Sequence, residues 1–523
     1  MIRPQVRMPT AHAAIQAPFH RFWMMGASAE AGSGRSKKNA SLAVHPESTT
    51  PEATDAAMTA KRRGPRGDDA RRRVWVDATY RLFLGWVRFI PGDISAQKTN
   101  ARVPQPYPDF GLLSRGDRGD LPHDDDAVTV RLMEAWTAPA PWPAPAPDPP
   151  AGYLDAVGGQ PVLAVARQAF AAALEQSWPD PARLHHGGRR TGLLLDTAKA
   201  SIARFLGVPA ADTYLGASAA QLLHACIEGM FAARIGAGAP ERIIVSEAES
   251  LAVLTAARSC PAAEVVTVPV TTTGAVDLDM LASALGQGAA LACVQVANAE
   301  VGTRQPLADV HRLCAEVGIP LVSDATQVAG HDDIRANGAI EPQWDALVAA
   351  PRDWGATAGC AVLVLGRGTR WKPAEAPDRG WVGGFPDVAA AAAAGAAAEY
   401  VAPYWRAQAD EHRAMIDHLR AEVAELPGVR AVGDPHDRLP HILTVVVDDA
   451  IGEAIVTDLD SRGLALASGS ACTADNRMSS HVLGAMAIAT PASLRISLPY
   501  GCTWRTIDDL LAALPEVLTE ARR

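Results

Sequence analysis

Apolar and polar residues repeat with two alternating periods between residues 153 and 518. Short apolar runs bounded by polar residues are typical of buried strands, and apolar residues at helical spacing lie between them. Repeated strand–helix units predict an α/β fold with a mainly parallel sheet and right-handed crossovers. Strands are expected at 242–246, 264–269, 290–297, from 321 onwards, at 344–349 and at 361–365, and helices at 161–175, 193–206, 221–235, 251–259, 278–285 and 307–317.

The pattern changes at both ends of this unit and divides the chain into three parts. After helices at 388–398 and 404–426, a smaller α+β unit is predicted, with strands at 442–447 and 493–498 and helices at 455–462, 480–485 and 507–518. The first 72 residues have few large apolar side chains, which predicts disorder. An amphipathic segment at 74–89 predicts a docking helix or a partner contact, and a Pro/Ala linker covers 138–150. The predicted parts are an N-terminal extension (1–150), a large domain (151–403) and a small C-terminal domain (404–523).

Composition narrows the function classes. The 523 residues carry a net charge of −10. The first 75 residues are rich in arginine and lysine and the remainder is acidic, which argues against a nucleic-acid binder. No apolar run reaches ~18 residues, so no membrane span is expected. The seven cysteines form no CxxC pair, which predicts a reducing cytoplasm and neither a disulfide framework nor a metal site.

The candidate site begins at the apolar run that contains Asp324. An acid at the carboxyl end of a buried parallel strand lies where α/β sheets bind ligands. Asp324 with Gln327 three residues later suits pyridoxal phosphate, whose ring nitrogen must stay protonated. The glycine-containing turn at 213–220 opens a helix and can bind a phosphate. The next strand leads into Pro351-Arg352-Asp353, and Asp353 stands where a Schiff-base lysine is needed.

Five motifs, in order and spacing, resemble the cysteine desulfurases in the class V aminotransferase group of fold-type I pyridoxal-phosphate enzymes. The resemblance covers about residues 153–518. It implies a large α/β domain, a smaller C-terminal domain and a dimer. The motifs are Tyr153-Leu154-Asp155, Asn298–Gly302 with Gln305-Pro306, Ser323–Gln327, Ser468–Thr473 with Ser480–Leu483, and Ser493–Leu498.

The resemblance assigns roles to individual residues. Arg495 would bind the substrate carboxylate as a bidentate clamp. Cys472, on a loop of small residues, would attack the substrate sulfur and carry a persulfide. An ordinary loop thiol at 472 and a strand arginine paired with an acid at 495 remain the alternatives. The expected cofactor contacts are Asp324 to the pyridinium nitrogen, Gln327 and Asn298 to the ring 3′-oxygen, and Ala217 and Ser218 to the phosphate.

The chain departs from the family at the cofactor itself. The motif Ser-x-His-Lys reads Ala350-Pro351-Arg352-Asp353, and Ser250 replaces the histidine that stacks on the ring. A carboxylate cannot form an imine, and a second acid near Asp324 disfavours ionisation of both. Arg352 would offset that charge and bind the phosphate as a fork. The family's arginine-glycine-threonine segment is not recognisable at Arg379-Gly380-Trp381.

These departures leave three hypotheses. The first is a catalytically degenerate relative that holds pyridoxal phosphate non-covalently, if at all, and acts as a homodimer or as a heterodimer with a related desulfurase. The second is an active, divergent cysteine desulfurase that mobilises sulfur from L-cysteine through Cys472 and passes it to an acceptor protein. The third is a sulfur acceptor that uses Cys472 without a cofactor. Lys199, expected to face solvent, and Lys372, beyond the strand at 361–365, are poor replacements for the missing amine.

Overall fold

A computed structural model describes residues 146–335, 339, 341–468, 480–490 and 492–522. The predicted docking segment at 74–89 and Cys472 lie outside the described residues, as does most of the N-terminal extension. No helix in the described ranges is long and apolar enough to cross a bilayer.

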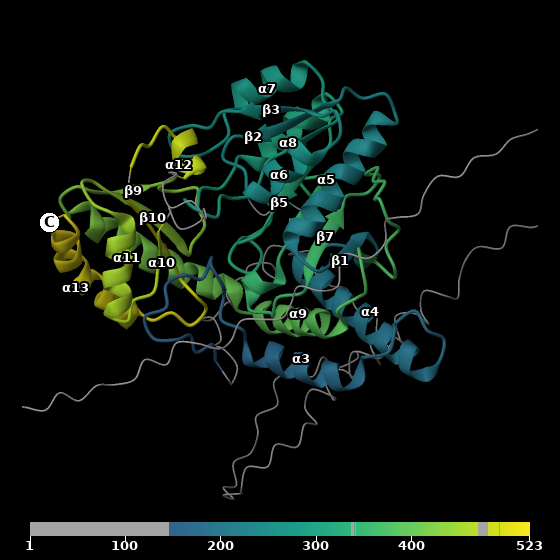
Figure 1. Ribbon diagram of the computed structural model, residues 1–523, viewed down its shortest axis with the longest axis horizontal. Coiled ribbons are helices and arrows are strands. Elements are labelled where there is room, and N and C mark those ends of the chain that lie inside the picture. The colour runs from purple at the N-terminus through teal and green to yellow at the C-terminus, as the bar shows by residue number, and fades with distance from the viewer. Residues whose placement is uncertain (1–145, 336–338, 340, 469–479, 491, 523) are drawn as a thin grey trace, which may run out of the picture. The chain divides into compact units, whose positions relative to one another are not determined.

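A large sheet forms the centre of the fold (Figure 1). It has eight strands in the order β3-β2-β4-β5-β6-β7-β1-β8. β7 runs antiparallel to its neighbours β6 and β1, and the other pairs are parallel. The mainly parallel sheet predicted from the sequence is thus confirmed. The strands are β1 (Thr213–Gly216), β2 (Arg242–Ser246), β3 (Glu264–Val268), β4 (Leu291–Cys293), β5 (Leu321–Asp324), β6 (Ala346–Ala349), β7 (Ala361–Leu365) and β8 (Trp381–Val382).

Helices cover both faces of this sheet, and each face has its own apolar core. On one side α9 (Val388–Val401) packs between α3 (Ala164–Gln176) and α4 (His186–Leu206). α9 consists almost wholly of alanine and is buried on nearly every side, as expected of a helix that is apolar all round. On the other side α5 (Ala219–Ile235) packs on α6 (Leu251–Ser259). The remaining helices here are α7 (Leu278–Gly286) and α8 (Leu307–Glu316).

The smaller unit is a four-stranded sheet in the order β11-β12-β10-β9, with helices packed on it. Asp155 bridges to β12 at Ser497, Tyr153 bridges to Ala465 just before β11, and Leu154 is buried in the core of this unit. The first described residues therefore join the C-terminal unit. The elements are α10 (Trp405–Ala424), β9 (Val429–Val432), β10 (Ile442–Val447), α11 (Gly452–Ser461), β11 (Ala467–Ser468), α12 (His481–Ala485), β12 (Ser493–Ser497) and α13 (Trp504–Ala521).

Element boundaries agree closely where a run is bounded by caps or breakers. The predicted strand 242–246 and helix 251–259 coincide with β2 and α6. The expected turn at 213–220 contains strand β1. This strand was not predicted because its apolar run is short and ends in a glycine. The expected strand 290–297 is shorter, because only Leu291–Cys293 is regular. Strands β8, β9 and β11 were not predicted.

Candidate functional site

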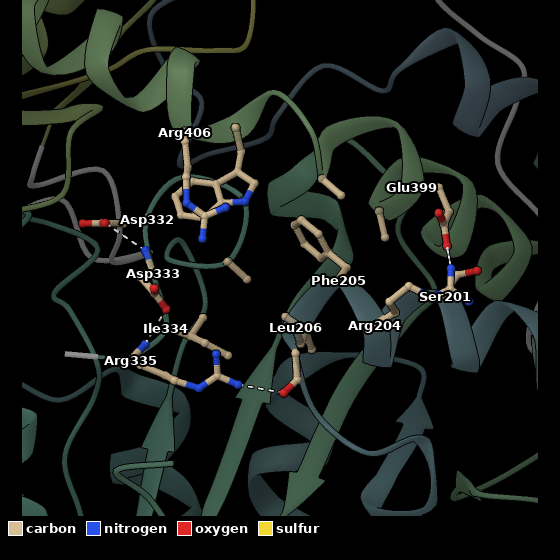
Figure 2. Close-up of a pocket in the computed structure, with 16 residues that line it drawn as sticks. Ser201, Arg204, Phe205, Leu206, Asp332, Asp333, Ile334, Arg335, Glu399 and Arg406 are labelled. Atoms are coloured by element: carbon tan, nitrogen blue, oxygen red, sulfur yellow. Dashed lines mark hydrogen bonds and ion pairs between the residues drawn. The ribbon is translucent and has the colours of Figure 1, made fainter. Parts of the chain in front are cut away.

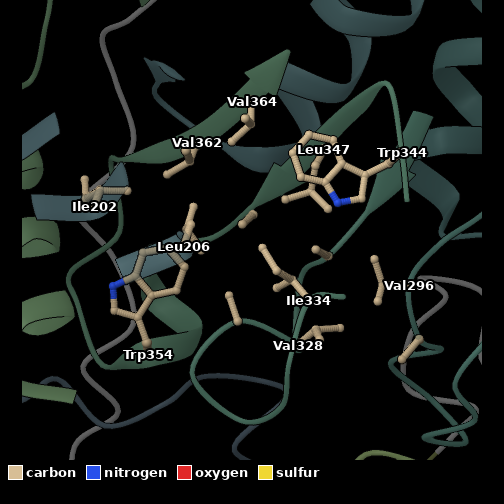
Figure 3. Packing of buried hydrophobic residues seen from close by; sticks show 14 of the residues in the cluster. Ile202, Leu206, Val296, Val328, Ile334, Trp344, Leu347, Trp354, Val362 and Val364 are labelled. Atoms are coloured by element: carbon tan, nitrogen blue, oxygen red, sulfur yellow. The ribbon is translucent and has the colours of Figure 1, made fainter. Parts of the chain in front are cut away.

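Two buried carboxyl groups lie at the carboxyl ends of adjacent strands. Asp324 is the last residue of β5, and Asp353 lies in the short 3-10 helix η3 (Pro351–Trp354) that follows β6. β5 and β6 are parallel, with Asp324 opposite Val348. Trp354 is fully buried in the core beneath the sheet (Figure 3), and its Nε1 donates to the Ala394 carbonyl at 3.4 Å. The packing of its neighbour Trp354 in the core therefore fixes the position of Asp353.

Gln327 connects the two acids. Its backbone has a φ of 68°, in the left-handed region that few residues adopt. Its backbone N–H donates to Oδ2 of Asp353 at 3.1 Å, and its side-chain Nε2 donates to Oδ1 at 2.9 Å and to the Val157 carbonyl at 3.4 Å. The amide hydrogens are thus directed at protein atoms. The predicted bond from Gln327 to a ring oxygen would require the side chain to leave Asp353.

Asp324 is a buried acid with neutral hydrogen-bond donors. Ser250 Oγ donates to its Oδ2 at 3.0 Å, and the backbone N–H and hydroxyl of Thr326 donate to Oδ1 at 2.9 and 2.7 Å. Burial raises the pKa of Asp324, and these hydrogen bonds lower it in part. Ser250, where the resemblance expects a ring-stacking histidine, also caps α6. A small donor to the acid thus replaces an aromatic ring.

Asp353 is only 3% exposed. Burial raises its pKa to about 6, and the negative charge of Asp324 adds to the shift, while the Gln327 N–H and the Arg352 guanidinium lower it. The expected mutual effect is thus found in one direction: Asp324 raises the pKa of Asp353, whereas Asp353 is not among the causes of the shift at Asp324. The distance between Arg352 Nε and Asp353 Oδ1 is 3.7 Å, and Arg352 Nη2 donates to the Gly158 carbonyl at 2.5 Å. Arg352 therefore offsets the charge only in part. Its predicted contact with a phosphate stays a prediction.

Glu249 is a third buried carboxyl, which sequence reasoning missed. It is completely buried, and it accepts the Gln295 N–H on one oxygen and the Ser250 N–H at 3.2 Å on the other. Burial raises its pKa to about 8, and the nearby Asp324 adds to this. At neutral pH Glu249 is therefore mostly protonated. Its place three residues after the end of β2 was the available signal.

Three buried histidines lie beneath Asp353, and these too were missed. His331 stacks on His441 with ring centroids 3.8 Å apart and on Tyr500 at 4.9 Å. His331 Nε2 lies 2.8 Å from the Asp353 carbonyl oxygen, which can only accept, so this nitrogen carries a hydrogen. Burial lowers the pKa of His331 to about 4 and that of His412 to about 3. All three rings are therefore neutral at physiological pH.

No lysine amine of the described chain lies against the two acids. The described ranges contain only Lys199 and Lys372. Lys199 is half-buried in α4, where burial lowers its pKa and Asp196 raises it. Lys372 lies beyond β7, and its backbone N–H donates to the Gly229 carbonyl. The charged neighbours that act on Asp353 are Arg352 and Asp324.

The helix α5 begins at the proposed phosphate end of the site. Ser218 caps it by accepting the Gln221 N–H at 3.2 Å, and the Ala217 N–H donates to the Gln221 side chain at 2.9 Å. Both residues are exposed at the amino terminus of a 17-residue helix, a setting that favours anions. Asn298 is held by its donation to Ala248 and by the N–H groups of the turn after it. Phosphate and ring contacts by these residues remain predictions.

Arg495 is already paired within the chain. It lies on β12 and is largely buried, and its Nη2 lies 3.2 Å from Oδ1 of Asp155. The alternative reading, a strand arginine paired with an acid, describes this contact. Its Nε is buried without a hydrogen-bond partner among the described atoms, so the guanidinium retains donor capacity. Cys472 cannot be placed, but Ser480 after its loop donates to Glu300 at 2.7 Å.

A separate cavity of about 310 Å³ lies between the end of α4, the loop around Gly330 and the start of α10 (Figure 2). Its lining charges are mostly engaged inside the protein. Arg204 pairs with Glu399, and Arg335 Nη2 donates to the Gly207 carbonyl at 2.7 Å. Neither Asp324 nor Asp353 lines this cavity.

The sequence matches the aminotransferase class-V family over residues 153–510, so the chain belongs to that family. It is 31% identical over 370 residues to the cysteine desulfurase NifS of Azotobacter vinelandii, covering 68% of this chain and 89% of the relative. It is 30% identical over 387 residues to the IscS-like cysteine desulfurase of Mycobacterium tuberculosis, covering 71% and 97%.

Solved structures agree on the fold. The NifS-like protein from Rickettsia africae matches with a TM-score of 0.62 and 21% identity, covering 71% of this chain and 99% of that one. The apo cysteine desulfurase from Thermococcus onnurineus matches with a TM-score of 0.61 and 15% identity, covering 71% and 95%. The chain is a cysteine desulfurase-like protein with the fold-type I architecture, as the motifs predict.

The residues present fit two of the three parts of pyridoxal phosphate. A buried acid with no cationic neighbour, Asp324, suits a protonated ring nitrogen, and the start of α5 suits a phosphate. When bound, the group supplies an electron sink. The aldehyde has no amine to bond to among the described residues, because a carboxyl group stands at 353.

Proposed function

We propose that this protein is a cysteine desulfurase-like protein in which coenzyme chemistry is weakened or lost. It holds pyridoxal phosphate through Asp324 and the start of α5, without a covalent bond. The observation that carries this proposal is Asp353. This buried carboxyl is tied to Gln327 by two hydrogen bonds and occupies the place of the family's lysine. A missing amine removes both the tether and a proton carrier, and the acid–base part alone typically contributes ~10²-fold or more.

The proposed role is that of a non-catalytic subunit in the cytoplasm. The chain would form a homodimer or pair with a lysine-bearing desulfurase, which its shared fold allows. The described cysteines are free and buried, which supports a reducing compartment. Affinity purification with an epitope-tagged chain tests the partner. Recovery of a related desulfurase in stoichiometric amounts supports the heterodimer, and a monomer with no partner contradicts both forms.

The chemistry is tested by sulfide release from L-cysteine with added pyridoxal phosphate. Wild-type protein should release at most a trace, about 10²-fold or more below an active desulfurase assayed in parallel. The Asp353→Lys variant adds the missing amine and should release more than wild type. Cofactor-dependent release by wild type at the rate of the active enzyme would overturn the proposal.

An active divergent desulfurase is the second candidate, and Arg495 favours it. The guanidinium is nearly buried and its Nε has no partner among the described atoms, so it retains capacity for a substrate carboxylate. In this case Cys472 would carry a persulfide after exposure to L-cysteine, and Cys472→Ala would abolish both label and release. Label at Cys472 only when a separate desulfurase is supplied would instead identify a sulfur acceptor.

A further inference from the structure

The acids around the proposed coenzyme site differ in charge at neutral pH. Glu249, with a pKa of about 8, is mostly protonated, whereas Asp353, with a pKa of about 6, is mostly ionised. Among the described residues, the one cation that acts on Asp353 is Arg352, which is about half exposed and donates to the Gly158 carbonyl. A buried negative charge therefore remains at 353 without a close, fully engaged cation.

Asp353 also retains unused acceptor capacity. A carboxylate has about four lone-pair positions, and the two hydrogen bonds from Gln327 use one position on each oxygen. An ammonium group, with three donors and a positive charge, complements such an acceptor. An aldehyde does not, because it carries no hydrogen-bond donor and its oxygen is repelled by a carboxylate.

The position of Asp353 indicates which part of the coenzyme it would meet. The motif resemblance places residue 353 where the family's lysine stands, and that lysine bonds to the carbon that bears the aldehyde. A carboxylate oxygen of aspartate corresponds in reach to the third carbon of a lysine side chain. That atom lies roughly a hydrogen-bond length from the place of the lysine nitrogen. An amine carried by the coenzyme itself would occupy that place.

We propose that the site selects the aminomethyl form of the coenzyme, pyridoxamine 5′-phosphate, over the aldehyde form, through an ion pair between its ammonium group and Asp353. This inference rests on the proposed function, because it assumes a coenzyme bound at Asp324 and α5. The negative charge of Asp353 would thus determine which form of the coenzyme binds more tightly.

Three ligands that differ only at this carbon test the proposal. The full-length protein is titrated calorimetrically at pH 7.5 with pyridoxamine 5′-phosphate, pyridoxine 5′-phosphate, whose hydroxymethyl group is neutral, and pyridoxal 5′-phosphate. The amine should bind about tenfold or more tightly than the alcohol, the factor that a hydrogen bond between charged groups typically gives. The preference should fall between pH 7.5 and pH 5 as Asp353 is protonated. Titration of the phosphate is common to the ligands and cancels in the ratio.

Two variants locate the effect. Asp353→Asn removes the charge with little change in shape and should bring the amine-to-alcohol ratio close to one. Asp309→Asn, on the exposed face of α8 beside Arg312, is the matched control and should leave the ratio unchanged. If Asp353→Asn does not fold, the pH dependence of the ratio in wild type decides the question.

The outcomes separate the two levels of the argument. Binding of the alcohol or the aldehyde as tightly as the amine overturns the selection and leaves the coenzyme site standing. An equal preference in wild type and Asp353→Asn also overturns it. If none of the three ligands binds at millimolar concentration, the coenzyme site fails and the selection fails with it.

Discussion

Replacing Asp353 by asparagine should make the protein more stable at neutral pH. Asp353 is 3% exposed, and burial is the main reason that its pKa is raised from 3.8 to about 6. Because the folded-state pKa is higher than the unfolded one, the folded protein binds the proton more tightly. Wild type therefore loses stability as the pH rises from about 4 through 6, and the loss is complete above that range.

The size of this loss follows from the shift. About two pKa units correspond to about 3 kcal/mol at pH 7.5, of which about 1.4 kcal/mol falls between pH 5 and pH 7.5. Asparagine does not titrate, but its amide nitrogen faces one of the two Gln327 donors. That mismatch costs about 1 kcal/mol at every pH. The expected net gain at pH 7.5 is about 2 kcal/mol.

Urea unfolding of wild type and Asp353→Asn at pH 5 and pH 7.5 measures this directly. The difference between the two proteins cancels titrations that both share, so the variant's advantage should grow by about 1.4 kcal/mol over this range. Asp309→Asn, at an exposed position on α8, should show no such growth. A variant that is less stable than wild type by the same amount at both pH values would refute the reasoning. That result would mean that the charge of Asp353 does not destabilise the folded protein.

Three further predictions concern the surroundings of the site. His441→Phe should protect against acid: burial lowers the pKa of His441 below 6.5, so wild type should lose stability as the pH falls below 6.5, and the variant's urea midpoint should fall less between pH 7.5 and pH 5. Gly330→Ala should lower Tm, with a cost of about 2 kcal/mol or more, because its φ is 89° and a Cβ would lie 2.6 Å from the Tyr500 hydroxyl. Ser250→Ala should cost about 1–2 kcal/mol in urea unfolding, since it removes a helix cap and a hydrogen bond to Asp324.

Much of the fold follows from local pattern. β2 is an apolar run next to a charged residue at each end, and α6 begins at a serine cap, so both could be placed to the residue. The start of α4 could not. The sequence predicts 193, but the helix begins at His186, since His185 caps it and two glycines in its first turn hide the helical pattern. Packing of α4 against α9 outweighs the low propensity of those glycines.

Site residues could be predicted from the sequence only where they belong to a recognisable motif. Asp324 and Asp353 each follow an apolar strand, so their convergence could be expected from parallel pairing. Glu249 lies 75 residues before Asp324, and His331, His412 and His441 come from three separate segments. These residues come together only in the tertiary structure, so no local spacing in the sequence predicts their contact. The pairing of Arg495 with Asp155 is likewise set by the bridge between residue 155 and β12.

Borohydride reduction with pyridoxal phosphate, followed by peptide mass spectrometry, tests the central claim most directly. The claim is that no lysine amine forms the coenzyme's tether in this protein. Wild type should yield no site-specific, stoichiometric coenzyme-modified lysine, whereas Asp353→Lys, measured in parallel, should yield one at residue 353. A wild-type protein reduced stoichiometrically at Lys199, Lys372 or any other single lysine would contradict the claim.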